Sequence, residues 1–329
     1  MTFRFLSALE VLVVFAVLQG PVWGASDHPA TVRITPLGSH DGEFCAADRA
    51  MVFEDPDGTR ILYDAGRTVR GPTDERLGHL DAVLLSHAHT DHLGDAIASA
   101  ANAGTCAAPE FAVKVVPNSN TVNITAARKT KLIVGSEMAI FLAAKVRDAG
   151  GDPKQVQLLR FGAQTKLGGV EISGVPAAHP NGLDPMFLTG DLAKNLAANA
   201  LTAYVGPAGG FVLKFSNGLV VYLSGDTGMM AEHDAIIRKF YHAKLVVLNI
   251  GGTFTTGPLE AAYVVNDMIQ PAAVIPSHAN EAATLNGKVV AGSKTEAFMK
   301  NTKVPVYLPL SGKPMDFDGD AHCLTGCTP

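Results

Sequence analysis

The segment Ser86–Asp95 constrains the fold of this chain more than any other feature of its sequence. It begins directly after an apolar run, Ala82–Leu85, that predicts a buried strand. Within six positions it holds three histidines and one carboxylate, namely His87, His89, Asp91 and His92. Zinc prefers imidazole nitrogen and carboxylate oxygen, and a loop past a strand end lets alternate side chains converge on one point. The sequence therefore predicts a metal centre at the end of a buried strand.

Three single residues further along the chain have the same setting. His179 and His278 each follow an apolar strand candidate, and Asp226 lies in a Gly-Asp-Thr-Gly turn after a third. Each one alone would be interpreted as an ordinary polar residue at a strand end. Together with the first segment, they supply enough ligand atoms for two metal ions that share one carboxylate.

This ordered set resembles the motifs of the metallo-β-lactamase superfamily. Ile61–Gly66 is similar to the early strand of that superfamily with its Asp-x-Gly turn. The resemblance implies an α/β (α+β) fold, a four-layer αβ/βα sandwich of two mixed β-sheets flanked by helices. It also implies two zinc ions, one held by His87, His89 and His179, the other by Asp91, His92 and His278, with Asp226 bridging both. The ligand types leave manganese or iron open as alternatives.

By the same resemblance, the chain is expected to be a hydrolase in which metal-bound hydroxide attacks a small ester, lactone or amide. Asp91 is the expected catalytic residue, because a carboxylate at this position can accept a proton as the intermediate collapses. Asp64 is expected either to support a ligating histidine or to cap its own turn. The predicted substrate-binding residues are His40, Phe44 and Asn249.

The substrate class stays open within this expectation. Asn249–Gly252, followed by Thr256–Ala262, resembles the branch that contains ascorbate-6-phosphate lactonase-like hydrolases, which favours a lactone. A β-lactamase and a metal-dependent phosphodiesterase are the alternatives on the same site. A net charge of -5, with no run rich in lysine and arginine, argues against nucleic acid as a substrate or partner. A protein that keeps the fold without activity and a di-iron redox centre are further alternatives, both disfavoured by the ligand set.

The order of predicted elements indicates sheet layers flanked by helices. Strands are predicted at residues 31–37, 50–53, 60–63, 82–85, 156–161, 170–175, 211–215, 219–223, 245–248, 273–275 and 304–307. Helices are predicted at residues 95–103, 137–149, 231–241, 259–269 and 294–301. Asp95 is expected either to be the N-cap of the first of them, which is preferred, or to orient a histidine. Residues 181–210 fit neither pattern and are interpreted as an insertion, either a lid over the site or a simple surface excursion.

The first residues of the chain predict export. Arg4 precedes a mostly apolar stretch, and small residues near Ala25 mark a cleavage point, so residues 1–24 are interpreted as a signal peptide and 25–329 as the hydrolase domain. We therefore expect a periplasmic or secreted protein, with no stable membrane insertion after removal of the leader. Four cysteines then allow two disulfides in three arrangements, or free thiols; pairing of Cys45 with Cys106 and of Cys323 with Cys327 is preferred.

Overall fold

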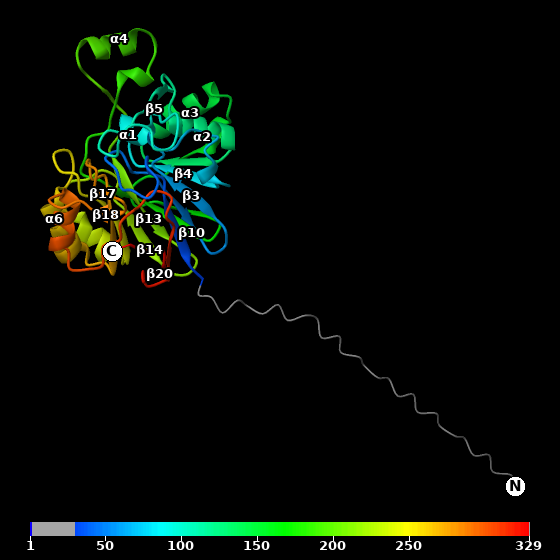
Figure 1. Ribbon diagram of the computed structural model, residues 1–329. Helices are drawn as coiled ribbons and strands as arrows, with labels where there is room; N and C mark the ends of the chain where they lie inside the picture. Colours follow the sequence, from blue (N-terminus) through cyan, green and yellow to red (C-terminus); the bar gives the residue numbers. More distant parts are fainter. Residues whose placement is uncertain (2–29, 329) are drawn as a thin grey trace.

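Two β-sheets, packed against each other, form the centre of the computed structural model (Figure 1), which describes Met1 and residues 30–328. The predicted signal peptide therefore lies almost entirely outside the described residues. Within the part of the chain that the structure describes, no helix has the length and apolar character needed to cross a membrane.

The first sheet contains eight strands in the order β20-β19-β1-β2-β3-β4-β7-β8. Strands β2, β3 and β4 run side by side, with β3 parallel to β4 and β4 parallel to β7. Their bounds are Val32–Pro36 (β1), Met51–Glu54 (β2), Arg60–Tyr63 (β3), Ala82–Leu85 (β4), Lys131–Val134 (β7), Val156–Leu158 (β8), Met315–Phe317 (β19) and Cys323–Thr325 (β20).

The second sheet contains six strands in the order β16-β15-β14-β13-β10-β9. It repeats the pattern of the first sheet, because an antiparallel pair, β13 and β14, is followed by two parallel strands, β15 and β16. The bounds are Gln164–Leu167 (β9), Val170–Pro176 (β10), Gly209–Lys214 (β13), Val220–Leu223 (β14), Leu245–Asn249 (β15) and Ala273–Ser277 (β16).

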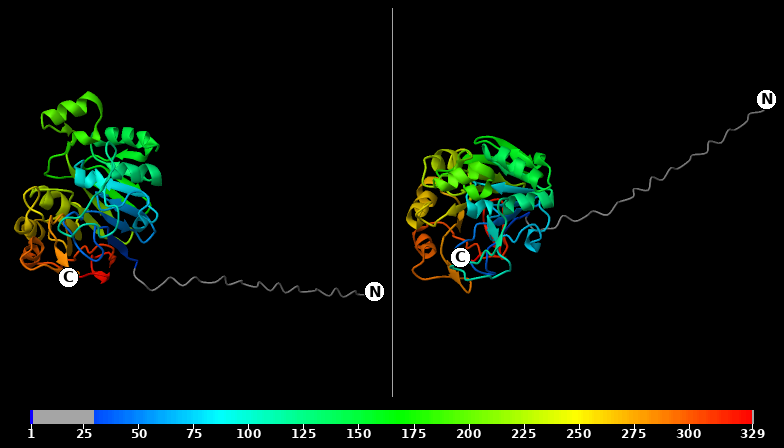
Figure 2. Two further views of the ribbon diagram at one scale, coloured as in Figure 1. Left: turned by 45° about the horizontal axis from the view of Figure 1, so that its top comes forward. Right: turned by 90° about the horizontal axis from the view of Figure 1, so that it is seen from above.

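Helices cover the outer face of each sheet. Helices α2 and α3 (Asn120–Arg128, Met138–Asp148) share an apolar cluster with the first sheet. The second sheet packs against α5 (Pro258–Tyr263), two π-helical segments (His233–Arg238, Val264–Ile269) and α6 (Lys294–Asn301). A third apolar cluster lies between the sheets and draws side chains from both. These layers confirm the predicted sandwich of two mixed sheets flanked by helices, and Figure 2 shows its two halves side by side.

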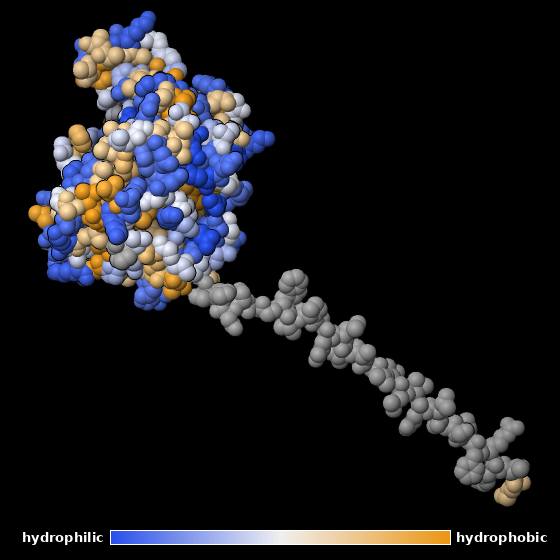
Figure 3. Space-filling model, viewed as in Figure 1, coloured by the Kyte–Doolittle hydropathy of each residue, from blue (hydrophilic) through white to orange (hydrophobic). Residues whose placement is uncertain are grey.

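Most of the segment 181–210 projects from this body, as seen at the top of Figure 1 and from two further directions in Figure 2, whereas its last two residues, Gly209 and Gly210, belong to β13. A short ladder of β11 (Gly182–Leu183) and β12 (Ala203–Tyr204) forms its base, and α4 (Gly190–Ala198) lies at its tip. Its surface includes hydrophobic residues (Figure 3), among them Leu192 and Leu201, each more than half exposed. The segment therefore has regular secondary structure of its own, whereas its movement as a lid stays a prediction.

The predicted helix at residues 95–103 is wrong. Ala96–Ile97 forms a short strand, β5, that pairs with β6 (Val113–Lys114). Asp95 does not cap a helix, because its buried carboxylate accepts a hydrogen bond from Arg67 Nε at 2.6 Å. The predicted strand at residues 304–307 is reduced to a single bridge between Val274 and Val306.

The cysteines are paired as preferred from the sequence, Cys45 with Cys106 and Cys323 with Cys327. The first disulfide joins the loop before β2 to the loop after β5, across 61 positions of the chain. It therefore fixes a segment of the first half that precedes Arg49, a residue of the site described below.

Acid destabilisation through His233 is expected from its position beneath Tyr222. The imidazole is fully buried, and burial lowers the pKa of His233 to about 4. Between pH 6.5 and 4 the unfolded chain binds a proton that the folded chain excludes, so stability is greatest above pH 6.5 and falls on acidification. Between pH 7 and 5, we expect the free energy of unfolding of His233→Phe to fall by about 2 kcal/mol less than that of the wild type, as measured by urea unfolding. His79→Phe, at an exposed histidine, is the control, and equal pH dependence in all three proteins would contradict this account.

Candidate metal centre

Strand ends from both sheets bring the predicted ligands to one place. The loop and short helix α1 (Thr90–Leu93) after β4 carry His87, His89, Asp91 and His92. From the second sheet, His179 follows β10, Asp226 follows β14 and His278 follows β16. All seven side chains lie together, in three overlapping groups whose nitrogen and oxygen atoms are within 4.8 Å of one another.

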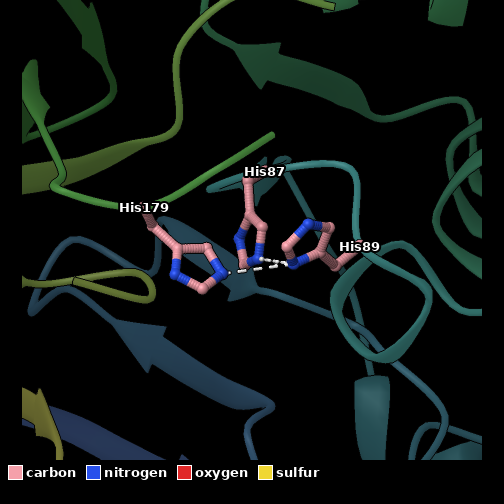
Figure 4. Close-up of side chains that lie close together, drawn as sticks. All are labelled: His87, His89 and His179. Carbon is pink, nitrogen blue, oxygen red and sulfur yellow. Dashed lines mark hydrogen bonds between the residues drawn. The ribbon is translucent and has the colours of Figure 1, made fainter. Parts of the chain in front are cut away.

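The first group consists of His87, His89 and His179 (Figure 4). His89 Nδ1 lies 3.1 Å from His87 Nε2 and 3.2 Å from His179 Nε2, so three ring nitrogens point toward one another. Burial is the main cause that lowers the pKa of all three imidazoles, and that of His87 falls well below its usual value. Neutral imidazoles keep the lone pairs that metal binding requires.

Asp226 lies between this group and the remaining ligands. Its Oδ2 is 3.0 Å from His278 Nε2 and 3.7 Å from His179 Nε2, while Oδ1 is 3.3 Å from His92 Nε2. Burial opposes the charged carboxylate, but the facing histidines outweigh it and hold the pKa of Asp226 well below its usual range. A single ionised carboxylate therefore faces both sets of histidines.

Several buried atoms of the centre have no hydrogen-bond partner, among them His92 Nε2 and Asp226 Oδ1, which lie 3.3 Å apart without the geometry of a hydrogen bond. Unpaired buried polar atoms are costly, and a metal ion is one of the few groups that explains them. Nitrogen and carboxylate oxygen are also the donors that zinc, manganese and iron share. The residues present therefore fit a metal ion.

Asp64 lies directly behind the histidines. Its Oδ2 accepts hydrogen bonds from Ser86 Oγ at 2.7 Å and is 2.8 Å from His92 Nδ1, while Oδ1 accepts from Ser86 N at 2.9 Å. Ser86 Oγ in turn lies 2.9 Å from His87 Nδ1. Burial disfavours a charged His92, but the carboxylates of Asp226, Asp91 and Asp64 outweigh it and raise its pKa to about 10, so an ion that binds at His92 Nε2 would displace a proton from it. Asp64 thus contacts a predicted ligand directly and another through Ser86.

A pocket of about 380 Å³ opens above these side chains. Its walls come from the predicted ligands, from the projection and from the loop after β15, and include Thr90, Pro180, Gly182, Asp184, Thr202 and Phe254. Asp91 is the most exposed carboxylate of the centre, at 26% of its side chain, compared with 5% for Asp226. Among the described residues, no lysine or arginine lines this pocket.

The structure does not bring the three predicted substrate-binding residues to this pocket. Phe44 is 1% exposed and packs in the apolar cluster beneath the second sheet, so it cannot contact a substrate. His40 lies against Ser39 and the Gly104 carbonyl instead. Asn249 is buried. Its side-chain amide accepts a hydrogen bond from Thr227 N and donates one to the Thr227 carbonyl, both at 3.0 Å, and so holds the turn that carries Asp226.

Arg49 is a residue of the centre that motif spacing did not reveal. Its guanidinium Nη2 lies 2.8 Å from Asp91 Oδ2, 2.8 Å from His278 Nε2 and 3.0 Å from Asn280 Oδ1. Burial raises the pKa of Asp91, but the Arg49 charge and the neighbouring histidines outweigh it and hold that pKa well below its usual range. The only signal in the sequence is the position of Arg49 just before β2, after Cys45.

Comparison with known proteins agrees with this geometry. Residues 59–279 match the family described as the beta-lactamase superfamily domain. A UPF0173 metal-dependent hydrolase of Koribacter versatilis is 30% identical over 237 residues, 71% of this chain and 82% of that protein. One from Methanoregula boonei is 30% identical over 240 residues, which cover 72% and 82% of the two chains.

Solved structures share the fold. Igni18, a metallo hydrolase from Ignicoccus hospitalis, matches with a TM-score of 0.57 and 20% identity over 88% of this chain and 99% of its own. The metallo-beta-lactamase fold protein YhfI from Bacillus subtilis matches with a TM-score of 0.54 and 14% identity over 87% and 99%. The chain therefore belongs to the metallo-β-lactamase superfamily of metal-dependent hydrolases.

Proposed function

We propose that this protein is an exported zinc-dependent hydrolase that cleaves a small ester, lactone or amide. The observation that carries the proposal is the pocket itself, whose floor is formed by convergent imidazoles and by the carboxylates of Asp91 and Asp226. When bound there, zinc would polarise a carbonyl oxygen and lower the pKa of water from about 15.7 toward about 7. Residues of this chain accept the proton and orient the ligands.

Asp91 is the proposed proton acceptor. Its side chain faces the pocket, and the Arg49 charge and the neighbouring histidines keep the carboxylate ionised at neutral pH. It can therefore orient water by accepting its hydrogen bond and take a proton only transiently. Arg49 fixes the orientation of Asp91 Oδ2 from the buried side. Asp64 and Ser86 orient the rings of His92 and His87, which keeps their other nitrogens directed into the centre.

The lining of the pocket favours an uncharged substrate over a phosphodiester. Phosphate recognition by side chains uses lysine, arginine or backbone N–H clusters, whereas the described lining contains no lysine or arginine and adds the carboxylate of Asp184. A small neutral ester or lactone has no such requirement. β-Lactamase activity on the same site remains the second candidate, because a β-lactam places a cyclic amide carbonyl in the same position.

Export is proposed on two observations. The first residues have the composition of a signal peptide, and both pairs of cysteines form disulfides in the folded chain. Disulfides persist in the periplasm and outside the cell, where no thiol pool reduces them.

Substrate class and metal dependence are tested together on the mature protein. A panel of γ-lactones, p-nitrophenyl esters, β-lactams and bis-p-nitrophenyl phosphate is assayed before and after chelation, and again after zinc, manganese or iron is restored. We expect turnover of lactones or esters, loss of at least about 90% of the rate on chelation, and recovery with zinc. Turnover that survives complete chelation, or hydrolysis of the phosphodiester alone, would refute the proposed function.

A further inference from the structure

Arg49 occupies the side of the centre where a second metal ion would bind. Asp91 Oδ2 and His278 Nε2 lie 3.3 Å apart, and Arg49 Nη2 is 2.8 Å from each of them. These are the atoms that the group of Asp91, His92 and His278 offers to an ion. An ion bonded to both at about 2.0–2.2 Å would lie within about 4 Å of the guanidinium nitrogen. At such a distance two positive charges in a protein repel strongly.

His278 Nε2, the nitrogen that a metal would need, already faces charged groups of this chain. It lies 2.8 Å from Arg49 Nη2, 3.0 Å from Asp226 Oδ2 and 3.3 Å from Asp91 Oδ2. The other ring nitrogen, His278 Nδ1, is buried and has no partner. Metal-binding histidines usually donate their second N–H to a carboxylate or carbonyl, as the contact of His92 Nδ1 with Asp64 allows. His278 lacks that support.

Arg49 is also held in place from several directions. Its side chain is 7% exposed, and Nη1 donates to the Ala46 carbonyl at 3.4 Å. The loop before it is fixed by the Cys45–Cys106 disulfide. His278 and Asn280, which both contact Nη2, have left-handed backbones, with φ of 48° and 54°. Non-glycine residues adopt that conformation at a cost, and such residues cluster at functional sites.

The three histidines of Figure 4 have no such competitor. Among residues 30–328, the hydrogen bonds and ion pairs of Arg49 go to Ala46, Asp91, His278 and Asn280, and none to His87, His89 or His179. The His87–His89–His179 group, with Asp226 beside it, is therefore free to take an ion while the opposite group is already neutralised by a fixed cation.

We propose that the guanidinium of Arg49 takes the place of the second divalent cation in this centre. The centre then holds one ion tightly, at the His87–His89–His179 group, and binds a second one roughly a hundredfold more weakly or not at all. This revises the expectation of two equivalent zinc ions. It rests on the proposed function only in requiring that the first group binds a metal.

Titration of metal-free protein with Co²⁺ and Zn²⁺ tests the proposal without any substrate. Isothermal titration calorimetry, with a competing chelator for the tight site, measures the number of ions and both affinities, and the visible spectrum of Co²⁺ follows each site. The wild type is compared with Arg49→Met, which removes the charge, and with Arg49→Lys, which keeps it. Arg67→Met is the matched control, because Arg67 pairs with Asp95 and contacts no predicted ligand.

We expect one tight ion in the wild type, in Arg49→Lys and in Arg67→Met, and a second ion that binds at least about tenfold more tightly in Arg49→Met than in the wild type. Two ions with affinities within threefold in the wild type would overturn the proposal, even if Arg49→Met failed to fold. So would a folded Arg49→Met protein whose second site is unchanged or weaker. Failure of the wild type to bind any metal would instead contradict the proposed function.

Discussion

Asp226→Ala is expected to lose bound metal and hydrolytic turnover together. The Asp226 carboxylate is 5% exposed and lies within 4 Å of His87, His92, His179 and His278, so its removal leaves four imidazoles without their shared anion. Loss of an outer-sphere partner of a metal ligand typically costs about 10- to 100-fold in metal affinity. Loss of a carboxylate that faces every group of the centre should lower metal affinity further. We therefore expect kcat/KM to fall at least about a thousandfold.

The measurement for this variant is metal content per chain, taken alongside kcat/KM on the best ester or lactone. Asp184→Ala is the control, because Asp184 lines the same pocket but belongs to none of the ligand groups and bonds the Met186 backbone. We expect it to keep its metal. Wild-type metal content and rate in Asp226→Ala would remove Asp226 from the centre.

Asp64→Ala is expected to weaken metal binding about 10- to 100-fold and to destabilise the fold at the same time. The substitution removes the acceptor of Ser86 N and Ser86 Oγ and the partner of His92 Nδ1, all of them buried. Each buried donor left unpaired costs about 1–3 kcal/mol. The ring of His92 would lose the contact that sets its orientation, so its metal-facing nitrogen would no longer be held in one place.

A matched variant separates these two effects of Asp64. Asp74 is also buried, and its carboxylate bonds Arg70 and Arg76 and none of the predicted ligands. Asp74→Ala should lose comparable stability in urea unfolding while keeping wild-type zinc affinity in a chelator competition. If both variants bound zinc equally well, Asp64 would be a turn-capping residue with no influence on the centre.

The sequence predicted the elements that position the centre because their patterns are local. Strands at residues 60–63 and 82–85 and the helix at 294–301 are found within the predicted bounds, since each combines an apolar pattern with clear end signals. The seven predicted ligands follow strand ends, and strand ends of two facing sheets meet, so the structure brings them together. Their role as ligands stays a prediction.

Other features of the site depend on contacts that no local pattern records. The helix predicted after Asp95 fails because a distant arginine, Arg67, binds that carboxylate. Phe44 looked available in a loop but is covered by the helices of the second sheet. Arg49 contacts His278 although the two residues are 229 positions apart in the chain, and it follows a loop that a disulfide joins to Cys106.

Anomalous scattering at the zinc absorption edge, from crystals of the mature protein grown with stoichiometric zinc, tests the central claim most directly. The account predicts a strong peak at about 2.0–2.1 Å from His87 Nε2, His89 Nδ1 and His179 Nε2, the three nitrogens that point toward one another. A map with no peak among these three histidines, obtained from protein that hydrolyses its substrate in the same buffer, would contradict it.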